Sequence, residues 1–136
     1  METSNIAKNV ERILSERPEV LFGYLHGSAL SSDNPRDIDV AVFLDPERYE
    51  NLVSEGELNL TFAIPLEMEL EARIGYKVDV QVLNGAPLPF QYRVIETGVL
   101  IADKDSDTRC DFESLTRVKY FDFRPRLRAY LQEIIT

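Results

Sequence analysis

The sequence predicts an α+β fold, in which helices alternate with short strands around one hydrophobic core. Three observations support this prediction. The chain has 136 residues, 44% of them hydrophobic, which suits a single domain that buries about two-thirds of its unfolded surface. Four short apolar runs have the composition of strands. Segments with helical spacing or helix-favouring composition separate these runs. We therefore expect one domain that spans residues 1–136.

The individual elements follow from local pattern. Apolar residues recur every three or four positions between Ile6 and Leu14, which predicts an N-terminal helix. The expected helices cover residues 4–16, 49–74, 87–98 and 110–135. Gly56 and Pro65 should split or kink the second helix, and Pro125 should interrupt the last one. The expected strands cover residues 20–26, 37–45, 77–85 and 99–103, the second central and the last at an edge.

Charge and composition exclude several function classes. The chain has 15 basic and 24 acidic residues, a net charge of −9, and no basic block, so a broad surface that tracks nucleic-acid phosphates is not expected. Cys110 is the single cysteine and cannot form an internal disulfide. The N-terminal segment is too charged for a signal peptide, and no apolar run approaches the length of a membrane span. We expect a cytoplasmic protein that binds neither membranes nor nucleic acid directly.

Two acids stand at the start of the second expected strand, in the segment DIDVAVFLD. Asp37 and Asp39 are two positions apart, so their side chains point to the same face of the strand. Neighbouring carboxylates repel each other and are costly to bury unless a proton or a cation neutralises them. Mg²⁺, which prefers oxygen ligands, suits this pair. Asp79, in KVDVQVL, joins them if the two strands are neighbours.

A Gly-Ser pair precedes the acids and offers groups that bind phosphate. Gly27 lets the backbone approach a ligand, and Ser28 supplies a hydroxyl and an amide for phosphate oxygens. A metal ion between those oxygens and the acids would orient an in-line attack on phosphorus. We therefore assign Asp37, Asp39 and Asp79 as catalytic residues and metal ligands. Gly27 and Ser28 are the expected nucleotide-binding residues, and the reaction is nucleotidyl transfer.

The segment HGSALSSDNPRDIDVAV resembles the signature of the nucleotidyltransferase superfamily, which includes DNA polymerase beta. The segments KVDVQVLNGAPLPFQYRVIETGVLIADKD and FESLTRVKYFDFRPRLRAYLQ extend the resemblance over nearly the whole chain, to the minimal nucleotidyltransferase antitoxins of the MntA family. The resemblance implies a nucleotidyltransferase fold, with an α/β two-layer arrangement and a mixed, mostly antiparallel sheet flanked by helices. It also implies that Asp79 is the third carboxylate of the site.

MntA-like antitoxins pair with HEPN-domain ribonuclease toxins. The resemblance implies a Mg²⁺-dependent adenylyltransferase that transfers AMP from ATP to a tyrosine of its toxin and silences the ribonuclease, in a hetero-oligomer with that toxin. Two other functions stay open. The same fold would serve an enzyme that modifies a small hydroxylated substrate such as an antibiotic, or a non-catalytic antitoxin that neutralises its toxin by binding alone. ATP turnover, with or without a protein acceptor, separates these functions.

The sequence departs from the family pattern around the Gly-Ser pair. His26 stands where the family usually has Phe, Arg36 stands where it has Ser, and the intervening loop is shorter. We interpret His26 as a packed or hydrogen-bonded residue beside the site rather than as a base. Because it is the only histidine in the chain, a nucleophilic role for Ser28 is not expected.

Three further features have ordinary structural interpretations. The segment DKDSDT, residues 103–108, imitates the start of a calcium loop but lacks its glycine and final glutamate, so we expect a polar turn that begins a helix. Glu67, Glu69 and Glu71 lie in an expected helix, where alternate residues do not share a face, and we expect them to be solvated. The aromatic residues of segment 120–123 either pack on the core or form a partner-binding surface, and the sequence leaves both open.

Overall fold

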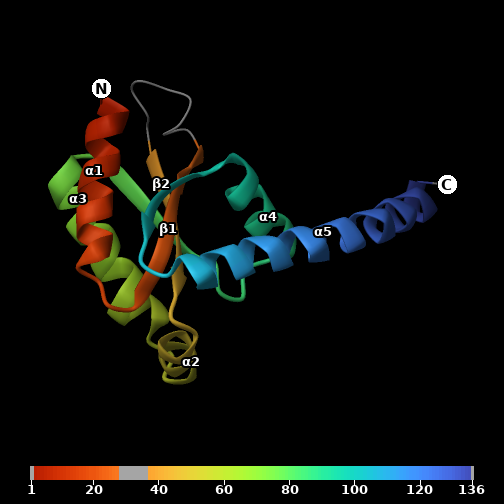
Figure 1. The fold of residues 1–136 in the computed structure, drawn as a ribbon, viewed down its shortest axis with the longest axis horizontal. Coiled ribbons are helices and arrows are strands. Elements are labelled where there is room, and N and C mark those ends of the chain that lie inside the picture. Colours follow the sequence, from red (N-terminus) through yellow and green to blue (C-terminus); the bar gives the residue numbers. More distant parts are fainter. Residues whose placement is uncertain (1, 28–36, 136) are drawn as a thin grey trace.

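The computed structural model describes residues 2–27 and 37–135 (Figure 1). Its helices are α1 (Glu2–Ser15), α2 (Pro46–Ser54), the π-helix η2 (Leu58–Ala63), α3 (Ile64–Ile74), α4 (Leu88–Thr97) and α5 (Ser106–Ile135). Its strands are β1 (Val20–His26), β2 (Asp37–Leu44), β3 (Lys77–Val82) and β4 (Val99–Asp103). Every expected strand is present, so the predicted alternation of helices and strands is confirmed. None of the described helices combines the length and the apolar character that a bilayer span requires.

The strands form one four-stranded sheet in the order β3-β2-β1-β4. β1 pairs antiparallel with β2 and with β4, whereas β2 pairs parallel with β3. The sheet is therefore mixed and mostly antiparallel, with β2 inside it and β4 at an edge, as expected. A parallel pair needs a long crossover connection, and here α2, η2 and α3 supply it.

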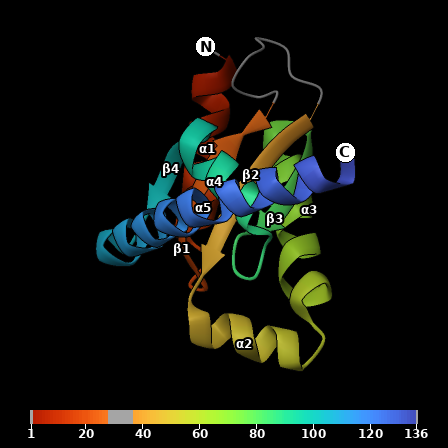
Figure 2. The same cartoon turned by 90° about the vertical axis from the view of Figure 1, so that its right-hand side faces the viewer.

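Helices cover both faces of the sheet (Figures 1 and 2). α1 and α3 pack on one face, where alternate side chains of β2 from Ile38 to Leu44 are fully buried. On the opposite face, Phe22 and Tyr24 of β1 belong to a cluster with Val94 of α4 and Phe112 of α5. The sheet is therefore flanked by helices, as expected, because this second face is also apolar over part of its surface.

The helical region after β2 is divided at positions marked by glycine and proline. α2 begins at Pro46, behind Asp45, whose side chain accepts a hydrogen bond from the Arg48 amide at 3.1 Å. Gly56, with a φ of 70°, lies between α2 and η2. Pro65 lies in the first turn of α3, where its missing N–H is tolerated. The predicted split of this region is confirmed.

α5 begins earlier than expected because its first turn is capped. The Asp105 carboxylate accepts hydrogen bonds from the Thr108 amide at 3.1 Å and the Thr108 hydroxyl at 2.8 Å. The bond from the backbone amide contributes most to lowering the pKa of Asp105. Segment 103–108 is therefore a turn and helix start, as predicted from its sequence.

The prediction that Pro125 interrupts the C-terminal helix is wrong. α5 continues from Ser106 to Ile135 with this proline inside it. Proline leaves the carbonyl four residues earlier without its N–H donor. Phe121 carries that carbonyl and is itself 57% exposed, so water can supply the missing hydrogen bond. Water relieves the lost hydrogen bond but not the clash of the proline ring with that carbonyl, so the proline costs stability without ending the helix.

A polar network attaches the first half of α5 to the sheet. The Tyr24 hydroxyl donates a hydrogen bond to Glu113 at 2.6 Å. Arg109 binds Asp103 at 2.8 Å and Glu113 at 3.1 Å. Burial, together with the bond to Glu113, holds the pKa of Tyr24 above its usual range, so the phenol remains the donor. Beyond these contacts, α5 extends away from the body of the molecule (Figure 1).

The outer part of α5 has several exposed apolar side chains. Thr116 is the one buried residue among those that the structure describes in this helix. The exposed large apolar side chains of the helix include Leu115, Val118, Phe121, Tyr130, Leu131, Ile134 and Ile135. In segment 120–123, Tyr120 stacks on Tyr92 of α4 with ring centres 3.9 Å apart, whereas Phe121 remains exposed. Tyr120 therefore packs on the protein itself, and the partner-binding interpretation of this aromatic segment stays a prediction.

The prediction that Glu67, Glu69 and Glu71 are solvated is wrong. Glu67 accepts a hydrogen bond from the Val80 amide at 2.8 Å, and Glu71 accepts one from the Val78 amide at 2.9 Å. Glu69 instead forms an ion pair with Arg17. β3 is an edge strand, so alternate N–H groups have no partner strand and bond to the helix beside them. Glu67 and Glu71, four residues apart, share the helix face that meets this edge.

Glu67→Ala and Glu71→Ala should each lower the free energy of unfolding by about 1–3 kcal/mol, because each removes a charged acceptor from an edge N–H group. The corresponding Gln variants keep an oxygen acceptor and should lose less. Urea unfolding followed by circular dichroism measures the change, with the exposed Glu11→Ala as control. Equal losses for Glu67→Ala and Glu11→Ala would contradict the edge-capping role.

Candidate active site

The acids predicted from the sequence lie on neighbouring strands. In the parallel ladder between β2 and β3, Asp39 stands beside Asp79 and Asp37 stands beside Lys77. The antiparallel ladder between β1 and β2 places His26 opposite Asp39. The condition set from the sequence, that the strands of Asp39 and Asp79 are neighbours, is met.

Gln81 connects two of these carboxylates. Its amide nitrogen lies 3.3 Å from Asp39 Oδ1 and 2.5 Å from Asp79 Oδ2. Its amide oxygen lies 2.5 Å from Nε2 of His26. Sequence reasoning missed Gln81, although a signal was present, because a residue two positions after Asp79 in a strand shares its face.

Gly27 brings the backbone of β1 against Asp39. Its φ of 77° is in the left-handed region that favours glycine. A Cβ added at this position would lie 2.3 Å from Asp39 Oδ2, so only a glycine leaves this carboxylate its place. Ser28 and Arg36, the other residues singled out in this segment, lie outside the described residues.

A cavity of about 320 Å³ opens beside this group. It is lined by His26, Gly27, Asp39, Gln81, Phe90, Arg93 and Thr97. His26 is 9% exposed, and its ring meets Phe90 edge-on, with ring centres 5.7 Å apart. His26 is thus a packed and hydrogen-bonded residue beside the site, as predicted. Arg93 lies over the Phe90 ring at 5.6 Å and gives the cavity a group that attracts phosphate.

The chemistry of the acids suits a hard cation. Asp37, Asp39 and Asp79 offer carboxylate oxygens, which Mg²⁺ prefers. Within residues 2–27 and 37–135, no group of three or more His, Cys, Asp or Glu side chains meets the geometric requirement for holding an ion. Asp39 and Asp79 share the Gln81 amide nitrogen instead. The donor type fits Mg²⁺, and the assignment of all three acids as its ligands stays a prediction.

Comparison with protein families identifies the fold. The model of the family described as "Polymerase beta, Nucleotidyltransferase" matches residues 8–107, which include Gly27 and the three acids. The chain belongs to this family. The nucleotidyltransferase fold implied by the sequence is therefore confirmed. No curated protein matches the sequence.

Solved structures with the same fold include chains of toxin-antitoxin complexes. A chain of the toxin-antitoxin MntA-HepT is 17% identical with a TM-score of 0.66, and the match covers 98% of this chain and 99% of that one. A chain of a tri-AMPylated Shewanella oneidensis HEPN toxin in complex with MNT antitoxin is 18% identical with a TM-score of 0.68 and the same coverage. A chain of a toxin-antitoxin with AMP-PNP is 19% identical with a TM-score of 0.67, covering 96% and 98%. At these identities the likeness establishes the fold.

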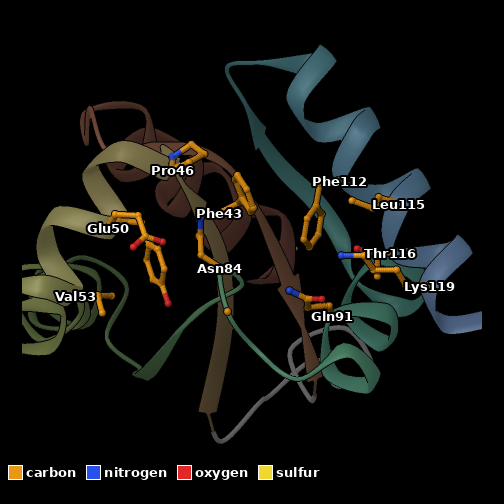
Figure 3. A pocket seen from close by; sticks show the side chains of 12 residues that line it. Phe43, Pro46, Glu50, Val53, Asn84, Gln91, Phe112, Leu115, Thr116 and Lys119 are labelled. Atoms are coloured by element: carbon orange, nitrogen blue, oxygen red, sulfur yellow. The ribbon is translucent and has the colours of Figure 1, made fainter. Parts of the chain in front are cut away.

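A larger cavity of about 470 Å³ lies near the other end of β2, next to Phe43 (Figure 3). Figure 3 shows Glu50 and Val53 of α2 on one side of it and Leu115 and Lys119 of α5 on the other. Glu50 is the one carboxylate among the described residues that line this cavity. Asp39 is likewise the one carboxylate among the described residues that line the smaller cavity, but it stands beside Asp79 in the ladder of β2 and β3, so the acids predicted from the sequence lie at the smaller cavity.

Gly27→Ala should impair nucleotide binding as well as stability. Gly75→Ala is a matched control, because Gly75 has a φ of 78° but no atom within 4 Å of an added Cβ. Left-handed strain should destabilise both variants by about 1–2 kcal/mol. Only Gly27→Ala also displaces the Asp39 carboxylate and should weaken ATP binding, measured by isothermal titration calorimetry. Equal ATP affinities in the two variants would contradict the importance of this contact.

Proposed function

We propose that this chain is an antitoxin adenylyltransferase, which transfers AMP from ATP to a tyrosine of a cognate HEPN ribonuclease toxin and so inactivates it. The carrying observation is the register of β2 and β3, which sets Asp39 beside Asp79 in a chain of the nucleotidyltransferase family. Two structures of the same fold support the choice of donor and acceptor. One is a toxin-antitoxin with AMP-PNP, and another contains a tri-AMPylated HEPN toxin. The reaction would take place in the cytoplasm, because ATP and the RNA substrates of the toxin are both found there.

Each candidate residue has a role in this reaction. Asp37, Asp39 and Asp79 would hold Mg²⁺, and Gly27 and Ser28 would bind the phosphates of ATP. The metal would supply neutralisation of phosphate charge. The tyrosine oxygen would attack the α-phosphorus while Asp79, if it acts as the base, takes the phenolic proton. The bond from the α-phosphorus to its bridging oxygen breaks, AMP stays on the tyrosine, and pyrophosphate leaves.

Net charge favours encounter with such a partner. A ribonuclease toxin needs a basic cleft to bind RNA, and this chain has a net charge of −9. The charge is unevenly distributed, since residues 117–136 contain five basic and two acidic residues, a sum of +3, which leaves −12 on the rest. Each AMP added to the toxin brings a negative phosphate near its RNA site and should repel RNA.

Coexpression with the toxin should yield toxin heavier by one or more AMP units. Asp37→Ala/Asp39→Ala should abolish this gain in intact mass spectrometry, because the carboxylates that would hold the metal are lost. Asp107→Ala/Asp111→Ala, which removes two exposed acids of α5, is the matched control and should leave the gain intact. Unmodified toxin that both wild type and Asp37→Ala/Asp39→Ala neutralise equally well would favour the binding-only antitoxin. ATP consumption with a small hydroxylated acceptor and no toxin would favour the enzyme that modifies a small substrate.

ATP binding should depend on Mg²⁺ or Mn²⁺, and Asp39→Asn should weaken it, because the acid pair needs a neutralising cation near phosphate. Calorimetry in Mg²⁺ and in chelator measures this dependence. Asp79→Asn should spare ATP binding and lower turnover by about 10²–10⁴-fold if Asp79 acts as the base. Equal losses of binding and turnover would make Asp79 a ligand alone. Equal ATP affinity with and without the cation would contradict the metal assignment.

A further inference from the structure

The carboxylates of Asp39 and Asp79 face each other with a neutral amide between them. Two carboxylates on adjacent residues of a parallel ladder repel each other, so the backbone pairing alone does not keep both side chains turned to one point. The Gln81 amide nitrogen donates to Asp39 Oδ1 at 3.3 Å and to Asp79 Oδ2 at 2.5 Å. A single amide carries two N–H groups, so it can serve both acids at once.

The two carboxylates determine which end of this amide faces them, and His26 binds the other end. Carboxylates accept hydrogen bonds, so the amide nitrogen must point to Asp39 and Asp79 and the amide oxygen must point away from them. That oxygen lies 2.5 Å from Nε2 of His26, which must therefore donate through its N–H. The imidazole is nearly buried and packs edge-on against Phe90, so its ring plane is held. His26 and Gln81 thus form a chain of donors that runs toward the acids.

We propose that Gln81 is a positioning residue of the nucleotidyl-transfer site and that His26 positions Gln81. The amide is neutral, so it holds both carboxylates at one point and leaves their negative charge unchanged. That charge would attract the cation. This inference rests on the proposed function for its effect on turnover, but the hydrogen-bond arrangement itself does not depend on that function.

Contacts of Gln81 distinguish this role from simple packing. The hydrogen bonds of its side chain go to His26, Asp39 and Asp79. Val80, next to it in β3, points to the opposite face and packs in the core between the sheet and α1 and α3. Removal of the amide should therefore leave the core intact and act on the two acids.

The first test uses the ligand-free protein. The side-chain amide signals of Gln81 in ¹H–¹⁵N spectra should move in Asp39→Asn, in Asp79→Asn and in His26→Phe, which keeps a ring but has no N–H donor. They should stay in place in Gln91→Leu, which removes a comparable amide bond to the Leu83 carbonyl at 2.8 Å, outside the site. Gln81 signals that none of the first three substitutions moves would overturn the proposal, whatever the catalytic activity.

The second test measures AMP transfer to the toxin. Gln81→Leu should lower kcat by about 10–100-fold, as loss of a residue that orients metal ligands does, with KM for the toxin unchanged. His26→Phe should lower kcat less, and His26→Gln, whose amide can donate to Gln81, should restore much of it. Gln91→Leu should keep wild-type kcat. Faster transfer by Gln81→Leu would overturn the proposal, because it would show that the amide blocks the site.

Controls separate this proposal from the proposed function. Thermal unfolding checks that each variant folds, and Gln81→Met replaces Gln81→Leu if the latter does not. If the wild-type protein transfers no AMP, the proposed function fails, and the amide signals alone decide whether His26 and Gln81 position the acids.

Discussion

The parallel pairing of β2 with β3 is the constraint on which the rest of this structure depends. It places Asp39 beside Asp79 at one end of the sheet. Parallel strands cannot be joined by a tight turn, so the chain must cross over between them. That crossover contains α3. Glu67 and Glu71 of this helix accept hydrogen bonds from the N–H groups at the open edge of β3. The connection that permits the acid pair therefore also protects the strand that carries Asp79.

The two faces of the sheet divide stability from chemistry. One face is buried along the whole of β2 under α1 and α3, and supplies most of the core. The other is apolar around Phe22 and Tyr24, where α4 and the first half of α5 cover it, and polar at the end that holds Asp39. The acids thus lie at the margin of a well-packed face. Their neighbours there are held in place by the core, so they can keep the two carboxylates together despite their repulsion. A site of this kind needs rigid strands beneath it.

The sequence predicted elements whose patterns are local and missed contacts that depend on the assembled fold. Alternation within β2 and β3 was enough to place Asp39 and Asp79 on strands and to anticipate their meeting. It was not enough for Glu67 and Glu71, because the unpaired N–H groups that they serve exist only once β3 becomes an edge. The prediction for Pro125 was wrong for a different reason, because the missing N–H and the ring of a proline cost a helix stability but do not by themselves end it. The roles of Asp37 and Ser28 remain predictions, whereas Gln81 was within reach of the two-residue spacing already used for the acids.

The extension of α5 beyond the body has an electrical consequence. With +3 on residues 117–136 and −12 on the remainder, the molecule carries a permanent dipole whose positive end lies on the far part of this helix. In the field of a charged partner such a molecule experiences a torque as well as an attraction, and rotates before contact. The acidic body turns toward basic surfaces while the helix tip turns toward acidic ones. Orientation during approach shortens the search for a productive contact, and salt should therefore slow association more than it speeds dissociation.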